Sequence, residues 1–241
     1  MYALKPQTAG LKVRLALYLR SLMLGLLLIV PTLPTAAATG LTQSVEVLGE
    51  SISYTLPEGY CPLEESAERE RTFVAYMDKA VGSSLKILKI AVPCTDLSAF
   101  RRDPEAGYLQ RYVAVAEVGL DRRMIKFRLG TTLYLKLLSS FKPTKLEKAE
   151  RRANKRLNDF GDGVRDLKFS YLGDEYGFAL YTGSAMLKRH ELSDEMMVRA
   201  TGGTSLSHSV PMAAFVYDSS GELDFKEMSN LIVPVLKSMF K

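Results

Sequence analysis

Four residues carry the side chains that most often do chemistry in proteins: Cys61, Cys94, His190 and His208. His190 opens the stretch "RHELSDE", which matches the start of the zinc-binding pattern H-E-x-x-H. Asp194 stands where the second histidine of that pattern would be, and zinc needs several convergent ligands. We therefore expect a polar loop here and no metal site.

His208 lies in the hydroxyl-rich stretch "TGGTSLSHS". A nucleophile needs a base within hydrogen-bond reach. In an extended chain, alternation turns Ser205, Ser207 and Ser209 to the face opposite His208, and Thr204 lies four residues away. The pattern therefore predicts a strand end broken by glycines, with no catalytic pair formed inside the stretch.

The two cysteines both follow predicted strands. Cys61 comes after "SISYTLPEGY" and Cys94 after "LKILKIAVP", so neighbouring strands would bring the two thiols to the same edge of a sheet. An even cysteine count in an exported chain suggests pairing. We predict a structural Cys61–Cys94 disulfide. A redox pair or metal site is the alternative, but the sequence has no C-x-x-C motif.

The N-terminus has the pattern of a secretory signal. The apolar run Leu22–Val30 has nine residues, whereas a membrane-spanning helix needs about 20. Pro31 follows it, and no acidic residue appears before Glu46. Four basic residues precede the run, which is the charge bias of a cytoplasmic flank: Lys5, Lys12, Arg14 and Arg20.

Small residues after the run supply a cleavage site. Ala36 and Ala38 occupy the A-x-A positions that a signal peptidase recognises. We expect residues 1–38 to be removed and the mature chain to begin at Thr39. The alternative is an uncleaved N-terminal membrane anchor that uses Leu15–Val30.

Removing the signal changes the charge of the chain. Residues 1–38 carry four of the 32 basic residues and none of the 27 acidic ones, which leaves 28 against 27, a net charge of +1. The overall charge therefore gives no reason to expect nucleic-acid binding. Residues 39–241 are long enough for one domain, and no linker or internal repeat divides them.

Hydrophobic periodicity predicts the elements. The alternation of Ile52, Tyr54 and Leu56 is typical of a half-buried strand. Strands are expected at 44–48, 51–60, 85–92, 110–118, 167–173, 176–183, 195–202 and 209–218, with a turn at Gly173–Asp174. Helices are expected at 68–82, 96–100, 144–160 and 224–241.

The segment 121–141 is ambiguous. Ile125, Leu129, Leu133 and Leu137 fit one face of a helix, which we predict, whereas Gly130 and "TTLYL" would also suit strands. The short turns between the C-terminal strands favour antiparallel pairing. The predicted fold is α+β: an antiparallel sheet with helices packed on it and a closing C-terminal helix.

A resemblance to known proteins is carried by the residues Leu56–Cys61, by Cys94 and by the final helix ending "LKSMF". These resemble the PsbP-like family of small exported extrinsic proteins, and uncharacterised exported bacterial proteins with an "LPEGYC" opening. The helical region 120–160 is longer than in that pattern. The resemblance implies a binding or accessory role and no reaction.

Basic residues gather on one face of the predicted helix 144–160, beside a narrow apolar stripe. A solvated helix lying on the core explains this face, and contact with an anionic surface is the functional alternative. No aromatic residues interleave with the basic ones, so nucleic-acid stacking is not suggested. The candidate contact residues are Lys145, Lys148, Arg152, Lys155 and Arg156.

Together these patterns predict an exported protein, periplasmic or secreted, with a binding or accessory role. We expect no cofactor, no metal and no catalytic residues, and the partner would be an unknown protein or envelope component. The alternative function is a small periplasmic hydrolase that uses His208 or His190, with a nucleophile from elsewhere in the chain.

Overall fold

The structure is a computed structural model of the 241-residue chain. It describes residues 40–80, 85–103, 109–119, 126–128, 130–140, 147, 150–151, 154, 164–188 and 195–241. These residues belong to one compact unit, Gly40–Lys241, and Met1–Thr39 lie outside the described part.

Nine strands and four of the helices have defined bounds within the described residues. The strands are β1 (Thr42–Val47), β2 (Glu50–Thr55), β3 (Tyr60–Pro62), β4 (Leu85–Pro93), β5 (Arg111–Val118), β6 (Val164–Glu175), β7 (Phe178–Lys188), β8 (Glu195–Ser207) and β9 (Val210–Asp218). The helices are α2 (Glu68–Ala80), α3 (Cys94–Arg102), α4 (Gly130–Ser139) and α6 (Phe225–Met239).

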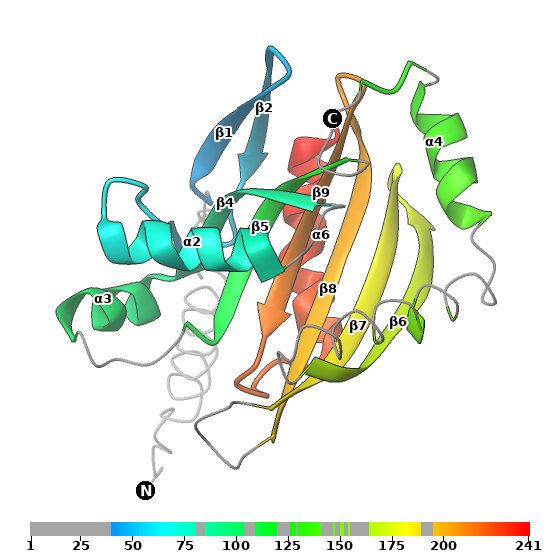
Figure 1. The fold of residues 1–241 in the computed structure, drawn as a ribbon. Helices are drawn as coiled ribbons and strands as arrows, with labels where there is room; N and C mark the ends of the chain where they lie inside the picture. The colour runs from blue at the N-terminus through cyan, green and yellow to red at the C-terminus, as the bar shows by residue number, and fades with distance from the viewer. Residues whose placement is uncertain are drawn as a thin grey trace, which may run out of the picture. The chain divides into compact units, whose positions relative to one another are not determined.

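Seven strands form one sheet in the order β3-β4-β5-β9-β8-β7-β6, and every neighbouring pair is antiparallel. The hairpin β1–β2 forms a separate two-stranded sheet. The α+β class predicted from the sequence is confirmed: helices pack on an antiparallel sheet, and the last helix closes the chain (Figure 1).

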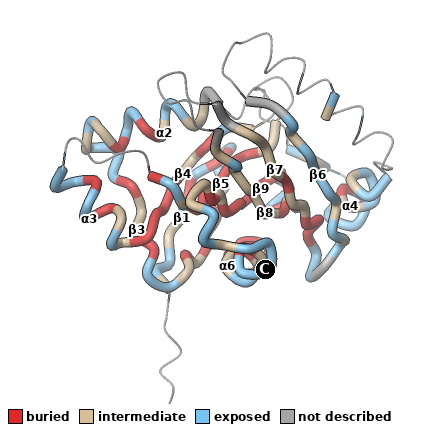
Figure 2. Tube along the Cα trace, turned by 90° about the horizontal axis from the view of Figure 1, so that it is seen from below, coloured by how far each residue is buried: buried red, intermediate tan, exposed pale blue. Residues whose placement is uncertain are grey.

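The middle of the sheet is buried on both sides. β5 reads "RYVAVAEV" and β9 reads "VPMAAFVYD", and most residues of both strands are buried (Figure 2). Small and β-branched residues alternate along β5, so each face of the strand meets a different packing layer. The two layers contain two separate hydrophobic clusters.

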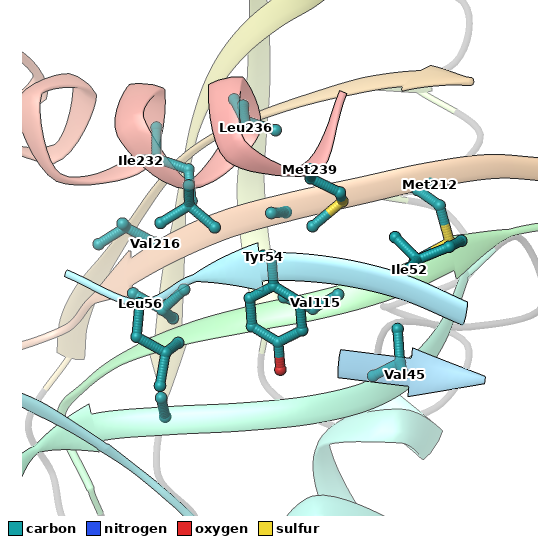
Figure 3. Packing of buried hydrophobic residues seen from close by; sticks show 14 of the residues in the cluster. Val45, Ile52, Tyr54, Leu56, Val115, Met212, Val216, Ile232, Leu236 and Met239 are labelled. Atoms are coloured by element: carbon teal, nitrogen blue, oxygen red, sulfur yellow. The ribbon is translucent and has the colours of Figure 1, made fainter. Parts of the chain in front are cut away.

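One side of the sheet is covered by α6 and the β1–β2 hairpin, and we call it the α6 face. The helix begins at a capping box, in which Asp224 accepts from the Glu227 backbone and the Glu227 side chain accepts from Asp224. Its buried residues pack against β2, β8 and β9 (Figure 3). They are Met228, Ile232, Val235, Leu236 and Met239.

The opposite side carries α2 and α3 over β3–β5 and α4 over β6–β8, and we call it the α2 face. Glu70 of α2 accepts a hydrogen bond from the guanidinium of Arg101 of α3, with 2.7 Å between Oε1 and Nε, and this ion pair joins the two helices. On α4, the Tyr134 hydroxyl lies 3.0 Å from Thr204 Oγ1 of β8, so this helix packs on the same side of the sheet as α2.

Two predictions about local structure are wrong. The β6–β7 turn lies at Tyr176–Gly177 and not at Gly173–Asp174, because β6 continues through a bulge near Gly173. The ambiguous segment contains the helix Gly130–Ser139, but its buried residue is Tyr134, and Leu133 and Leu137 are exposed. Leucine spacing misidentified the packed face because a single aromatic ring fills this contact.

Within the described residues, no helix is long and apolar enough to cross a membrane.

Candidate functional site

The structure joins Cys61 and Cys94 in a disulfide, with their Cα atoms 5.0 Å apart. Cys61 lies in the edge strand β3, opposite Val92 of β4, and Cys94 is the first residue of α3. The backbone N–H of Cys94 also donates to the carbonyl of Gly59 at 2.8 Å. The pair therefore fastens a three-residue edge strand to the helix that follows its neighbour.

His208 lies in a turn and not at a strand end. With Ser209 it forms the two-residue connection between β8 and β9, and both residues have positive φ, 48° and 67°. Positive φ at both positions is the conformation of a type I′ hairpin turn. The side chain of His208 is exposed, and its charge makes a small contribution to lowering the pKa of Glu50, which is lowered mainly by the hydrogen bond and charge of Lys126.

Two of the hydroxyls that the sequence groups with His208 are bonded elsewhere. Thr204 Oγ1 donates to the carbonyl of Met212 at 2.7 Å, and Ser205 Oγ donates to the carbonyl of Gly177 at 2.6 Å. The absence of a catalytic pair inside this stretch stays a prediction. The two glycines do not break β8, which runs through them to Ser207.

Several predicted site residues lie outside the described part of the chain. They are His190, the cleavage residues Ala36, Ala38 and Thr39, and the basic residues Lys145, Lys148, Arg152, Lys155 and Arg156.

An aromatic surface on the α2 face is the clearest candidate site. It is built from two rows that cross the sheet in register. The first row runs Tyr171, Tyr181, Gly202 and Phe215 over β6, β7, β8 and β9. The second row, two residues along each strand, runs Phe169, Gly183, Ala200 and Tyr217. We call these eight residues the aromatic platform; Figure 1 shows the four strands that carry them side by side.

Glycines allow the rings to lie close to the sheet. A Cβ added at Gly183 would come within 2.9 Å of the Phe169 ring, and one added at Gly202 would come within 2.5 Å of Phe215 Cβ. Aromatic side chains on a neighbouring strand can cover glycines in this way. Ring contacts hold the tyrosines at both ends of the platform. At one end the ring centroids of Tyr171 and Tyr181 lie 5.3 Å apart, and at the other Tyr217 stacks on Tyr112 of β5 with centroids 4.8 Å apart.

The platform is partly open to solvent. Phe169 is 41% exposed, and Tyr171, Tyr181, Ala200, Gly202 and Tyr217 are intermediate between buried and exposed. Gly183 and Phe215 are buried. Burial raises the pKa of Tyr181 to about 12, with smaller contributions from Tyr134 and Asp174, and burial raises the pKa of Tyr217 to about 12. Both phenols are therefore neutral at physiological pH, and the surface suits an apolar partner.

Glu117 is the most unusual ionisable residue among those described. It is 1% exposed, and neither of its carboxylate oxygens has a hydrogen-bond partner. It lies on the α6 face of β5, directly between Lys86 of β4 and the buried Met212 of β9. Burial raises the pKa of Glu117, an effect that Lys86 partly offsets. Glu117 is the one acidic residue in the apolar strand "RYVAVAEV", and that position could have indicated a buried carboxyl group. It was not identified from the sequence.

Among the residues that the structure describes, no group of three or more His, Cys, Asp or Glu side chains is placed to hold a metal ion.

No protein-family model matches the sequence, and no curated protein sequence matches it. Among solved structures, the chain is similar to one titled "Protein Mog1 E65A mutant", with 13% sequence identity. The alignment covers 83% of this chain and 89% of that one, with a TM-score of 0.29.

Proposed function

We propose that this is an exported protein with a non-catalytic binding or accessory role, and that it binds an apolar segment of a protein partner on the aromatic platform. The observation that carries the proposal is the platform itself: its rings come from β6, β7 and β9 in register, and all of them except the buried Phe215 are partly exposed. Aromatic side chains are enriched at protein interfaces because they supply a large apolar area with little loss of side-chain entropy.

Export rests on the sequence. A positively flanked run of nine apolar residues, followed by A-x-A at Ala36–Ala38, favours a cleaved signal, and the disulfide Cys61–Cys94 suits an oxidising compartment. N-terminal sequencing of the native protein should begin at Thr39 or within a few residues. Recovery of an intact Met1 species from membranes would favour the anchor instead.

The binding proposal is tested by placing a photoreactive phenylalanine at Tyr181 in cells that export the protein. A discrete cross-linked protein partner is expected from this position. The control position is Tyr176, which is 64% exposed in the β6–β7 turn but lies under the ammonium group of Lys237, away from the platform. Equal cross-linking from both positions, or adducts with lipid alone, would contradict a protein-binding platform.

The hydrolase alternative has a separate test. Purified mature protein is assayed with esterase, peptidase, glycosidase and phosphatase substrates. An activity that survives purification and is lost in His208→Ala or His190→Ala would replace the binding proposal.

Contact with an anionic surface through the basic residues of 144–160 stays a prediction, checked by salt-dependent binding to anionic liposomes.

A further inference from the structure

The helix α4 leaves apolar side chains open to solvent, and most of it is drawn as exposed in Figure 2. Tyr134 is its buried residue, and the hydroxyl 3.0 Å from Thr204 Oγ1 fixes which side of the helix meets the sheet. Leu133 is 40% and Leu137 46% exposed. Residues four apart lie on the same side of a helix, so the two leucines form one apolar strip along the flank of α4.

Basic side chains lie beside this strip. With 3.6 residues per turn, Lys136 is about 160° around the helix from Tyr134 and about 60° from Leu133, which places it on the solvent side next to the strip. Arg128 stands two residues before the helix begins, and the ring of its neighbour Phe127 packs against Tyr134 with centroids 5.3 Å apart. Lys136 and Arg128 are both exposed.

The positive charge of the mature chain is concentrated around this helix. Seven basic residues and no acidic residue lie between Asp121 and Glu147. Subtracting these seven from the 28 basic residues of 39–241 leaves 21, against 27 acidic ones, so the remainder of the chain is net negative. One of the seven, Lys126, is already paired with Glu50 at 2.7 Å. The others give this part of the chain a positive potential that attracts an anionic surface.

We propose that α4 is a docking surface for an anionic phospholipid bilayer. Leu133 and Leu137 enter the headgroup region, and Arg128 and Lys136 contact lipid phosphates. Basic residues beside exposed leucines on a short helix are typical of helices that lie in the membrane interface. The helix has ten residues and is about 15 Å long, which suits a helix lying along the surface. This role is independent of what binds the aromatic platform.

The first test is sedimentation of the mature protein with vesicles of equal parts phosphatidylglycerol and phosphatidylcholine. The wild type should bind them, and binding should fall with added salt. Leu133→Gln with Leu137→Gln should bind at least about tenfold more weakly. Glutamine has a helix propensity close to that of leucine, and the variant keeps every charge, so this loss cannot come from the basic residues of 144–160.

The matched control is Leu41→Gln with Met197→Gln. These side chains are 49% and 48% exposed but lie outside α4, and the control should bind the vesicles as the wild type does. Arg128→Gln with Lys136→Gln should weaken binding by roughly tenfold and reduce its salt dependence. Wild-type affinity in the folded leucine variant, or equal losses in that variant and the control, would overturn the proposal.

A fluorescence measurement locates the contact and also serves if the glutamine variants fold poorly. The chain has no tryptophan, so Leu137→Trp supplies a single fluorophore and keeps an apolar side chain at the strip. With the same vesicles its emission should shift to the blue and be quenched by lipids brominated on their acyl chains. The control Met197→Trp should show neither change. Unaltered emission from vesicle-bound Leu137→Trp would overturn insertion of this strip.

Discussion

The two faces of the seven-stranded sheet are built from the same strands but are covered differently. On the α6 face, residues such as Phe178, Met212 and Val216 are fully buried beneath α6 and the β1–β2 hairpin. On the α2 face, helices cover the two flanks, and the aromatic platform between them is half exposed. One face has the packing of a core, and the other leaves several aromatic rings partly open to solvent.

This difference separates stability from binding. Alternation along β7, β8 and β9 sends neighbouring residues to opposite faces, so Leu180 packs in the α6-face core while Tyr181 belongs to the platform. Substitutions on the α6 face should therefore lower the free energy of unfolding, and substitutions on the platform should mainly change binding.

The largest effect is expected from Leu236→Ala on the α6 face. Leu236 is fully buried, and its Cδ1 atom lies against Gly203 of β8. Removing it leaves a cavity that should lower the free energy of unfolding by about 2–5 kcal/mol. Urea denaturation measures the change. A loss below that of Tyr181→Ala would contradict the assignment of the core to this face.

The disulfide should contribute on a similar scale. Cys61 and Cys94 are 33 residues apart, and closing a loop of that length stabilises the fold by about 3–4 kcal/mol in the chain-entropy model. The double variant Cys61→Ser with Cys94→Ser should therefore unfold at lower urea. Alkylation tests the disulfide directly, because neither cysteine should react with the reagent in folded protein until the bond is reduced.

Two buried glutamates should give opposite pH dependences. Burial raises the pKa of Glu117 above its ordinary value of 4.5, so the folded state holds its proton more tightly and stability falls as the pH rises through that pKa. For Glu70, burial alone would raise the pKa, but hydrogen bonds from Arg101 and the Glu64 backbone lower it. The stability that Glu70 contributes is lost as the pH falls.

The variants Glu117→Gln and Glu70→Gln resolve these two contributions. In Glu117→Gln the decline in stability above pH 4.5 should be absent. At the alkaline end its free energy of unfolding should therefore exceed that of the wild type by about 1–3 kcal/mol. Glu70→Gln should leave that decline intact and remove part of the decline toward acid. Urea denaturation across pH 4–9 measures both. A Glu117→Gln protein with an unchanged alkaline slope would contradict an unpaired buried carboxyl.

The smallest change in stability is expected on the platform. Tyr181→Ala removes a half-buried ring and should lower the free energy of unfolding by about 1 kcal/mol or less. Tyr181→Phe keeps the ring and should change neither stability nor binding, since the phenol is neutral and apolar contact carries the interaction. Thermal unfolding of the two variants distinguishes loss of the ring from loss of the hydroxyl.

Sequence patterns predicted the elements whose burial is periodic. The strand 110–118 and the C-terminal helix follow directly from their apolar spacing, and the disulfide follows from two cysteines that each come after a predicted strand. The platform could not be predicted in this way. It depends on register across four strands, such as Tyr181 opposite Gly202 and Gly202 opposite Phe215, and periodicity within one strand does not determine register between strands.

Tertiary contacts also decide the remaining cases. Whether Glu117 is a solvated residue or a buried one depends on what covers the end of β5, which the strand sequence does not specify. The bonds of Glu150 and Asn154 to β6 join residues 13 to 19 apart that no motif links. From the sequence alone, the segment 144–160 was predicted only as a charged helix.

We propose the aromatic platform as the surface that binds the protein partner. The most direct measurement is the affinity of the purified partner, identified by cross-linking at Tyr181, for the wild type and for Phe169→Ala, Tyr181→Ala and Tyr176→Ala, by titration calorimetry. We expect binding to be weaker by about tenfold or more for the two platform variants, because loss of an interface ring commonly costs more than about 1.4 kcal/mol. Binding should be unchanged for Tyr176→Ala. Unchanged affinity in folded Phe169→Ala and Tyr181→Ala would contradict the proposal.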